Sequence, residues 1–328
     1  MESNRFGLSV IPERDPRKVI DLCVLAERLG FDYIWMADEG PEFYDPFILL
    51  SYVASRTRSI KLGTGITNPY MRHPALTASA MMSLNALSHG RAVLGIGAGG
   101  SLALPKLGLE MWKKPVDTLE RTINALKEIF EAKRVNATST AWNIRNLKWP
   151  YPPANIPIYV GAKGPRMIRV AAQEADGLLL STLPLNQLRR TVRSLKTEVD
   201  RNFDLAYISR VCIGNEKSAK KLVKPYLTFS VADCARELLH DAGISEEDQQ
   251  HVRRRLESGG QASAAELISD ETVDALAVAG TAKNCAKAIQ ERFGAGIDHF
   301  IVSPPYGLNQ EKALFTVSRK IIHPLKRR

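Results

Sequence analysis

The chain alternates short, continuously apolar segments with amphipathic helical segments eight times, and this rhythm limits the folds open to it. Segments such as Ala92 to Ile96 are apolar at consecutive positions, which is typical of strands buried on both faces of a parallel sheet. The expected strands are 6–11, 32–36, 60–63, 91–95, 156–160, 177–181, 205–213 and 297–302. The expected helices are 16–29, 46–55, 74–87, 115–132, 165–174, 185–202, 281–293 and 310–322.

Eight strand–helix units within 328 residues indicate an α/β fold, a (β/α)8 TIM barrel, that occupies residues 1–328 as a single domain. The alternative is an open, doubly wound sheet, which would carry a glycine fingerprint for a dinucleotide after its first strand. The residues Gly7-Leu8-Ser9-Val10 do not supply that fingerprint, so we favour the barrel.

Two segments interrupt the rhythm of strands and helices. Residues 136–153 alternate and are rich in Asn, Trp and Pro, which predicts a hairpin or a loop excursion before the fifth strand. Residues 216–278 are polar and helical, and they are too long for one connection. We therefore expect a helical insertion, approximately 214–280, before the last strand.

Composition favours a globular protein that is not anchored in a membrane. Hydrophobic residues make up 45% of the chain, yet no apolar run approaches the roughly 20 residues of a membrane helix. The first residues lead directly into a strand rather than a signal peptide, and the four cysteines are scattered without metal-type spacing. We expect reduced thiols, no membrane association, no bound metal and a cytoplasmic location.

The net charge of +10 favours anionic partners. Basic residues gather in 189–196, 217–224, 253–255 and 326–328, where they either form solvated helix faces or attract a small polyanion. No interleaving of aromatic and basic residues accompanies this charge, so we expect no binding to nucleic acid.

Three of the expected strands end in glycines, at 63–69, 95–101 and 161–166. In a barrel of parallel strands, the carboxyl ends meet at one mouth, so these glycine corners are expected to share a site. The segment Gly161 to Arg166 turns from a strand into a helix, whose unpaired N–H groups and dipole favour a phosphate. The alternative is an ordinary strand-to-helix turn that needs glycine for its backbone conformation.

Motifs spread over nearly the whole chain carry a resemblance to a known family. They are Phe6-Gly7-Leu8, Trp35-Met36-Ala37-Asp38, Leu62 to Pro69, Arg72-His73-Pro74, Gly90 to Gly97, Pro157 to Pro165 and Ala175-Asp176-Gly177. These residues resemble the bacterial luciferase-like superfamily of flavin and deazaflavin enzymes. The runs Thr-Gly-Ile-Thr-Asn-Pro-Tyr and Gly-Ala-Lys-Gly-Pro are most similar to methylenetetrahydromethanopterin reductases, which use coenzyme F420, an 8-hydroxy-5-deazaflavin.

The resemblance implies a cofactor in the barrel mouth and an insertion before the final strand. It places the phosphate-bearing tail of the cofactor on Gly161, Ala162, Lys163, Gly164 and Pro165. It also implies a non-prolyl cis peptide bond between Gly65 and Ile66 behind the ring, with Thr67 beside it; the alternative is a normal trans turn. The amides of Gly97, Ala98 and Gly99 are expected at the polar edge of the ring.

The resemblance further implies an acid at Asp38 that contacts the cofactor headgroup, although Asp38 is also suited to a helix N-cap or a surface position. Relatives commonly carry acids where this chain has Gly100 and Ser9, so either Asp38, Glu13 or a water supplies the proton, or the substrate differs. Asn68, Arg72 and His73 follow the third strand and are expected to face the substrate; His73, next to Pro74, is equally suited to a helix start.

Three functions follow as hypotheses. The first is an F420-dependent oxidoreductase that transfers a hydride to or from a small anionic substrate, 5,10-methylenetetrahydromethanopterin or a related one-carbon pterin. The second is an FMN-dependent monooxygenase of the same fold. The third is a barrel that binds a ligand or nucleic acid without catalysis. By resemblance alone, the protein is expected to form a homo-oligomer, either a dimer or a tetramer.

Overall fold

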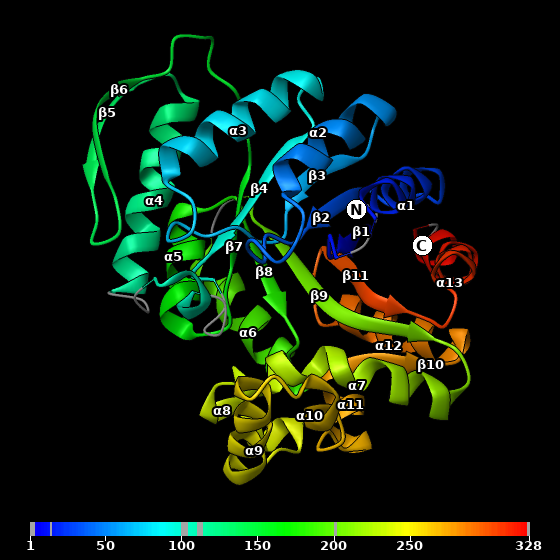
Figure 1. The fold of residues 1–328 in the computed structure, drawn as a ribbon. Coiled ribbons are helices and arrows are strands. Elements are labelled where there is room, and N and C mark those ends of the chain that lie inside the picture. Colours follow the sequence, from blue (N-terminus) through cyan, green and yellow to red (C-terminus); the bar gives the residue numbers. More distant parts are fainter. Residues whose placement is uncertain (1–3, 14, 100–103, 110–113, 200–201, 327–328) are drawn as a thin grey trace.

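The computed structural model describes residues 4–13, 15–99, 104–109, 114–199 and 202–326, and eight parallel strands form a closed barrel at its centre (Figure 1). The ring closes because the first half of the long seventh barrel strand pairs with the strand before it in sequence. The TIM-barrel prediction is therefore confirmed, and the open-sheet alternative is wrong. In chain order the barrel strands are β1 (Arg5–Val10), β2 (Tyr33–Met36), β3 (Lys61–Thr64), β4 (Ala92–Gly97), β7 (Ile158–Gly161), β8 (Gly177–Ser181), β9 (Asp204–Ile213) and β11 (His299–Tyr306).

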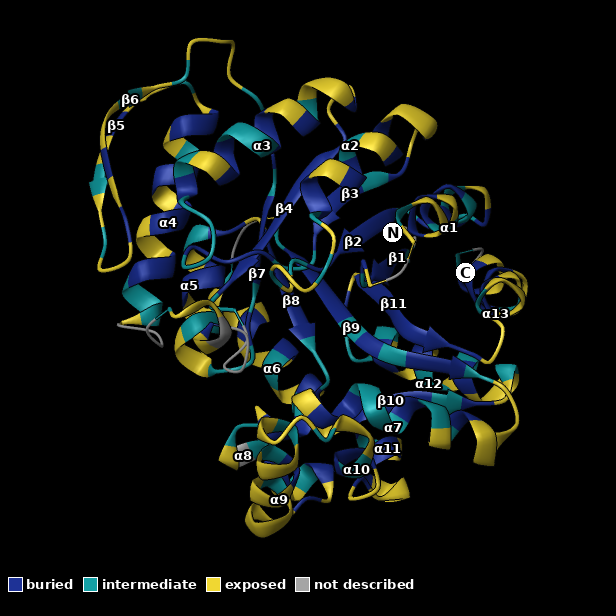
Figure 2. Cartoon of the chain, viewed as in Figure 1, coloured by how far each residue is buried: buried dark blue, intermediate teal, exposed yellow. Residues whose placement is uncertain are grey.

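Helices surround the barrel and bury their apolar faces against it (Figure 2). Two of them begin with an aspartate and a proline, a combination that satisfies a free N–H group and presets the first turn. The surrounding helices are α1 (Pro16–Arg28), α2 (Pro46–Arg56), α3 (Pro74–Leu87), α4 (Pro115–Phe130), α5 (Pro165–Glu174), α6 (Leu185–Glu198), α12 (Ala282–Gly294) and α13 (Gln310–Val317). The last helical run continues as a π-helical segment, Ser318–Ile322, and as α14 (His323–Lys326).

The interior of the barrel is packed with large side chains. A separate buried cluster inside the ring contains Tyr33, Trp35, Tyr159 and Ile301. Trp35 is fully buried, and its ring lies edge-on to that of Tyr159 with 5.2 Å between centroids. These aromatic rings fill the centre of the barrel, so an open site is left to the mouth where the strands end.

The segment between β9 and β11 folds as several helices with an apolar core of their own (Figure 1). They are α7 (Glu216–Ala232), α8 (Arg236–Leu239), a 3-10 turn (His240–Ala242), α9 (Glu246–Glu257), α10 (Gln261–Ala265) and α11 (Asp270–Leu276). A short strand, β10 (Ala277–Gly280), then pairs in parallel with the second half of β9. Sequence analysis missed β10 because its four residues follow directly on a helix and carry no turn signal between them.

The segment before the fifth barrel strand is a hairpin of β5 (Arg134–Thr138) and β6 (Asn143–Lys148), as the alternation of residues 136–153 predicted. It extends beside α4 at the edge of the molecule (Figure 1). No helix among the described residues has the length and apolar character needed to cross a membrane.

The approach of β3 to β4 leaves no room for a side chain at Gly95. A Cβ atom there would lie 2.1 Å from the backbone oxygen of Thr64. Because a backbone atom cannot move aside without breaking the strand pairing, we expect Gly95→Ala to lower the free energy of unfolding by about 3 kcal/mol, the upper end of usual overpacking costs. Urea denaturation measures this change.

Gly294→Ala is the matched control, because a Cβ atom there would meet no atom within 4 Å. Alanine also favours helix over glycine, so the control should be as stable as the natural protein or more so. Equal losses in both variants would contradict the packing argument.

Candidate active site

A cavity of about 270 Å³ opens at the barrel mouth, where the carboxyl ends of the strands meet; we call it the mouth cavity. It combines apolar walls, hydroxyl groups and charged side chains, the mixture expected of a small-molecule site. Its lining residues are Ser9, Ile11, Ala37, Glu39, Gly65, Ile66, Gly161, Ala162, Lys163, Leu179, Ser181, Thr182, Ile208, Arg210, Ser230 and Ser303.

Ile66 forms part of one wall of the mouth cavity, and two glycines hold its side chain in place. A Cβ atom on Gly97 would lie 2.4 Å from Cδ1 of Ile66, and one on Gly161 would lie 2.7 Å from the same atom. The glycines at the ends of β4 and β7 therefore provide the space that this side chain fills. The peptide bond between Gly65 and Ile66 is cis, as predicted.

Backbone hydrogen bonds fix the residues on both sides of this bond. The amide of Gly65 donates to the carbonyl of Met36 at 2.7 Å, and the amide of Thr67 donates to the carbonyl of Gly95 at 3.0 Å. Thr67 pairs with Ile96 in an isolated parallel bridge, so pairing with β4 resumes after Ile66. The Gly65–Ile66 unit is thus held at both ends and stands at the cavity wall.

Asp38 is anchored by neighbouring polar groups rather than directed into the mouth cavity. The hydroxyl of Thr67 donates to its carboxylate at 2.7 Å, and Nε of Arg72 lies 3.5 Å away. Arg72 also pairs with Asp45 at 2.8 Å, and its guanidinium lies 4.5 Å from the centre of the Phe47 ring. The carboxylate is almost fully buried, so its contact with a cofactor stays a prediction.

Two cations face the mouth cavity, Lys163 from the β7–α5 turn and Arg210 from β9. Loss of hydration lowers the pKa of both side chains; the charge of Arg210 lowers the pKa of Lys163 further, whereas Glu39 raises that of Arg210. Arg210 donates to the hydroxyl of Ser303 at 3.0 Å. Two cations that repel each other across a cavity create a strong preference for an anion between them.

The start of α5 adds to this positive region. Gly164 is the N-cap residue and therefore offers no side chain to bond the first N–H groups of this helix. Gly161, Ala162 and Lys163 line the mouth cavity, whereas Gly164 and Pro165 are not among its lining residues. The local geometry is that of an anion site at a helix N-terminus, with Lys163 beside it.

Glu39, rather than Asp38, is the carboxylate that lines the mouth cavity, because side chains alternate along the extended residues after β2 (Tyr33–Met36). Water reaches Glu39, but partial loss of hydration raises its pKa; Asp38 adds to this rise, and Arg210 opposes it. Ionisation of an acid whose pKa is raised in the folded state lowers the stability of the fold. This loss of stability disappears as the pH falls below that pKa. Such a group in a cleft is a candidate proton donor.

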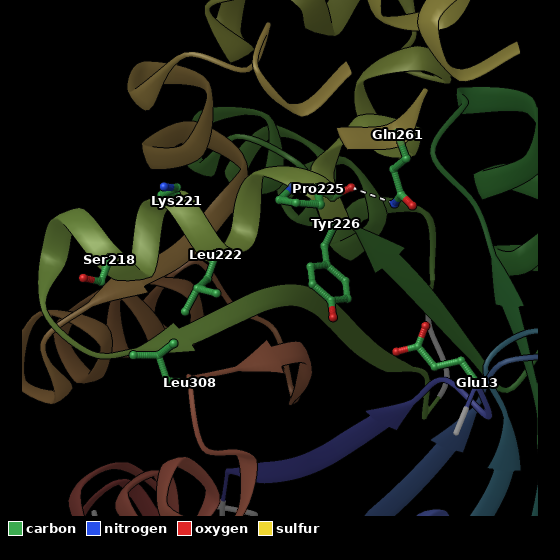
Figure 3. Close-up of a pocket in the computed structure, with 8 residues that line it drawn as sticks. All are labelled: Glu13, Ser218, Lys221, Leu222, Pro225, Tyr226, Gln261 and Leu308. Atoms are coloured by element: carbon green, nitrogen blue, oxygen red, sulfur yellow. Dashed lines mark hydrogen bonds between the residues drawn. The ribbon is translucent and has the colours of Figure 1, made fainter. Parts of the chain in front are cut away.

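Glu13 lies outside the mouth cavity. It lines a neighbouring cavity of about 610 Å³, which we call the side cavity, between the loop after β1 and helix α7 (Figure 3). The other lining residues are Ser218, Lys221, Leu222, Pro225, Tyr226, Gln261 and Leu308. The structure therefore separates the two predicted acids, Asp38 and Glu13, into different surroundings.

The remaining predicted residues have mainly structural contacts. The amide oxygen of Asn68 accepts from the backbone N–H groups of Tyr70 and Met71, at 3.1 and 2.9 Å. Nδ1 of His73 accepts from Ala75 at the start of α3, and its Nε2 lies 3.2 Å from the carbonyl of Asn143. These contacts fit the helix-start alternative for His73, and its role toward a substrate gains no support.

Gly97, Ala98 and Gly99 support the site from behind. None of the three lines the mouth cavity, and a Cβ atom on Gly99 would lie 3.1 Å from the Asn68 side chain. Gly100, where relatives were expected to carry an acid, lies outside the described residues. Ser9 does line the mouth cavity, and its carbonyl accepts from the hydroxyl of Tyr306.

Sequence analysis missed Arg210 as a site residue. A signal was present, because Arg210 is the one charged residue of the expected strand 205–213. A cation inside a barrel strand is costly unless it serves a partner or a ligand. The hydroxyls of Ser181, Ser230 and Ser303 carried no such signal, since a serine is unremarkable in a strand or a helix.

Comparison with known proteins agrees with this geometry. The family model described as luciferase-like monooxygenase matches residues 3–299. The chain belongs to the luciferase-like family. Within this family, it is 31% identical to the 5,10-methylenetetrahydromethanopterin reductase of Archaeoglobus fulgidus, over 98% of this chain and 100% of that protein. Its identity to the enzyme of the same name from Methanolobus tindarius is 29%, over 97% and 99% of the two chains.

Solved luciferase-like structures share the fold. The coenzyme F420-dependent tetrahydromethanopterin reductase from Methanopyrus kandleri superimposes with a TM-score of 0.89 and 27% identity, over 99% of this chain and all of that chain. Among the residues that the structure describes, no group of three or more His, Cys, Asp or Glu side chains could hold a metal ion.

The hydroxyl of Thr67 is expected to stabilise the fold through Asp38. Thr67→Val keeps the shape of this fully buried side chain but removes the donor to a buried carboxylate. We expect the free energy of unfolding to fall by about 1–2 kcal/mol. Thr316→Val is the control, because that exposed hydroxyl donates only to its own helix, and its effect should stay within about 0.5 kcal/mol. Urea denaturation measures the free energy of unfolding of both variants. Equal losses in the two variants would contradict a special role for the Thr67 hydroxyl.

Proposed function

We propose that this luciferase-like protein is an F420-dependent oxidoreductase that transfers a hydride between the deazaflavin and a one-carbon pterin such as 5,10-methylenetetrahydromethanopterin. The observation that carries the proposal is near-full-length similarity to reductases of that name, together with a mouth cavity that carries two cations. An FMN-dependent monooxygenase is the alternative, because the family model is named for such enzymes.

The donor set of the mouth cavity fits a flat ring that carries an anionic tail. Ile11, Leu179 and Ile208 offer apolar walls, and the Gly65–Ile66 unit offers a surface that is fixed from behind. Lys163 and the start of α5 suit a phosphate, with Arg210 as a second cation. We assign the ring to the Gly65–Ile66 wall and the phosphate to the Lys163 side.

When bound, a deazaflavin supplies a hydride at carbon C5 of its ring. The protein's contribution is orientation and the removal of water. Ile66 cannot retreat, because its side chain fills the space beside Gly97 and Gly161. A fixed wall on one face leaves the opposite face for the substrate. Glu39 has a raised pKa and lines the same cavity, so we add it to Asp38 as a candidate proton donor.

The proposal is tested by mixing the purified protein with reduced F420 and methylenetetrahydromethanopterin in the absence of oxygen. Oxidation of F420 with formation of the methyl product is expected, followed by absorbance and mass spectrometry. A parallel assay with reduced FMN measures oxygen uptake. Oxygen uptake with FMN and no reaction with F420 would overturn the proposal and support the monooxygenase.

The positive charge of Lys163 is expected to hold the cofactor's phosphate. Lys163→Gln retains most of the side-chain length but removes the charge, so the Kd for F420 should rise about tenfold, equal to about 1.4 kcal/mol. The salt dependence of binding should also weaken. Fluorescence titration measures both effects.

Lys217→Gln, on the exposed start of α7, is the control and should leave the Kd unchanged. An unchanged Kd in Lys163→Gln would refute the assignment of the phosphate to this turn.

We further propose that the enzyme acts in the cytoplasm as a homo-oligomer. Adjacent helices α2 and α3 begin at the same end of the barrel and expose Ile48, Tyr52 and Leu76, with 71, 57 and 64% of their surfaces accessible. Neighbouring apolar side chains of this size are typical of an interface, and a second copy can use the same face. Light scattering should give at least twice the mass of one chain; a monomer would refute this proposal.

A further inference from the structure

The side cavity that contains Glu13 is larger than the mouth cavity, about 610 Å³ against about 270 Å³. Its volume lies within the range of about 300–1,000 Å³ that is usual for small-molecule sites. Figure 3 shows Glu13 and Tyr226 directed into this space from opposite walls, the loop after β1 and helix α7. Leu222 and Leu308 add apolar surface, and Lys221 lies on the exposed side of α7.

The side cavity adjoins the mouth cavity through two shared walls. The guanidinium of Arg210, which lines the mouth cavity, lies 5.7 Å from the centre of the Tyr226 ring, which lines the side cavity. On the other wall, the amide of Glu13 donates to the carbonyl of Ile11 at 2.9 Å. The charge of Glu13 also raises the pKa of Arg210. A ligand in the side cavity would therefore lie next to a cofactor in the mouth cavity.

The two cavities differ in the charge that they offer a ligand. Lys163 and Arg210 make the mouth cavity favourable to a phosphate, whereas the side cavity presents the exposed carboxylate of Glu13. A carboxylate disfavours an anion and favours a group with N–H donors, which it can accept in pairs. Tyr226 offers a ring face beside it, and the exposed Lys221 suits an acidic tail that leads to solvent.

We infer that the side cavity binds the head of the pterin substrate, with Glu13 accepting hydrogen bonds from the aminopyrimidinone edge and Tyr226 covering the ring. This inference rests on the proposed function and assigns to Glu13 a role in substrate binding rather than in proton transfer. The one-carbon unit of a pterin held in this way lies at the boundary of the two cavities, on the side of the deazaflavin.

Binding without reaction is the direct test. Tetrahydromethanopterin that lacks the methylene group is titrated into the protein by calorimetry. Glu13→Gln retains the shape of the side chain but removes its charge and replaces one hydrogen-bond acceptor with a donor. The Kd of this variant for tetrahydromethanopterin should therefore rise about 10- to 100-fold. In turnover, KM for the methylene substrate should rise by a similar factor with little change in kcat. The Kd for F420 should stay unchanged, which also reports that the barrel is folded.

Glu247→Gln is the matched control, because its side chain is 81% exposed on α9 and lines neither cavity. A second pair of variants examines the aromatic wall. Tyr226→Phe retains the ring and should bind the pterin nearly as well as the natural protein, whereas Tyr226→Leu should bind it more weakly. Both variants should bind F420 normally.

The outcomes distinguish this inference from the proposed function. If the natural protein binds F420 but neither binds nor reduces the pterin, the proposed substrate is wrong. If the natural protein reduces the pterin and Glu13→Gln has the same Kd and KM, the inference about the side cavity is wrong while the function stands. A fall in kcat at unchanged KM in Glu13→Gln would indicate that Glu13 acts in proton transfer rather than in substrate binding, and would also refute the inference.

Discussion

The contact of Ile66 with two glycines is the constraint on which the site depends. Three strand ends meet there, since Ile66 follows β3, Gly97 ends β4 and Gly161 ends β7. Any side chain on either glycine would overlap the Ile66 side chain, so the three ends have one compatible arrangement. The Ile66 part of the mouth-cavity wall is therefore packed directly against the barrel strands, which suits a site that orients a flat ring.

Charge is arranged around this wall so that the two cavities favour different chemical groups, an anion in the mouth cavity and N–H donors in the side cavity. Cations line the mouth cavity beside the start of α5, whose N-cap is a glycine, and a carboxylate lines the side cavity. Arg210 stands between them, in contact with Ser303 on one side and Tyr226 on the other. An anionic group and a group with N–H donors are thereby directed to adjoining places by electrostatics before any close contact forms.

The fold was readable from the sequence because buried parallel strands and amphipathic helices each leave a periodic pattern, and the glycine corners marked the mouth. The Gly65–Ile66 cis bond followed from family resemblance alone. The side-chain directions were not readable: Asp38 and Glu39 are adjacent, yet Glu39 lines the mouth cavity while Asp38 bonds to Thr67. Which of two neighbours faces a cavity depends on where a strand ends, to within one residue. Glu13 likewise required tertiary structure, since α7, which is distant from it in the sequence, supplies most of the lining of its cavity.

Strand β9 changes neighbours along its length: Ile208 still pairs with β8, whereas Arg210 pairs with β10. The helices between β9 and β10 can consequently vary in length or composition without disturbing a hydrogen bond of the closed ring, because β10 pairs with the second half of β9 after them. Those helices also supply most of the side-cavity wall. An enzyme built in this way can acquire a new substrate by exchanging one segment while its redox machinery is inherited intact.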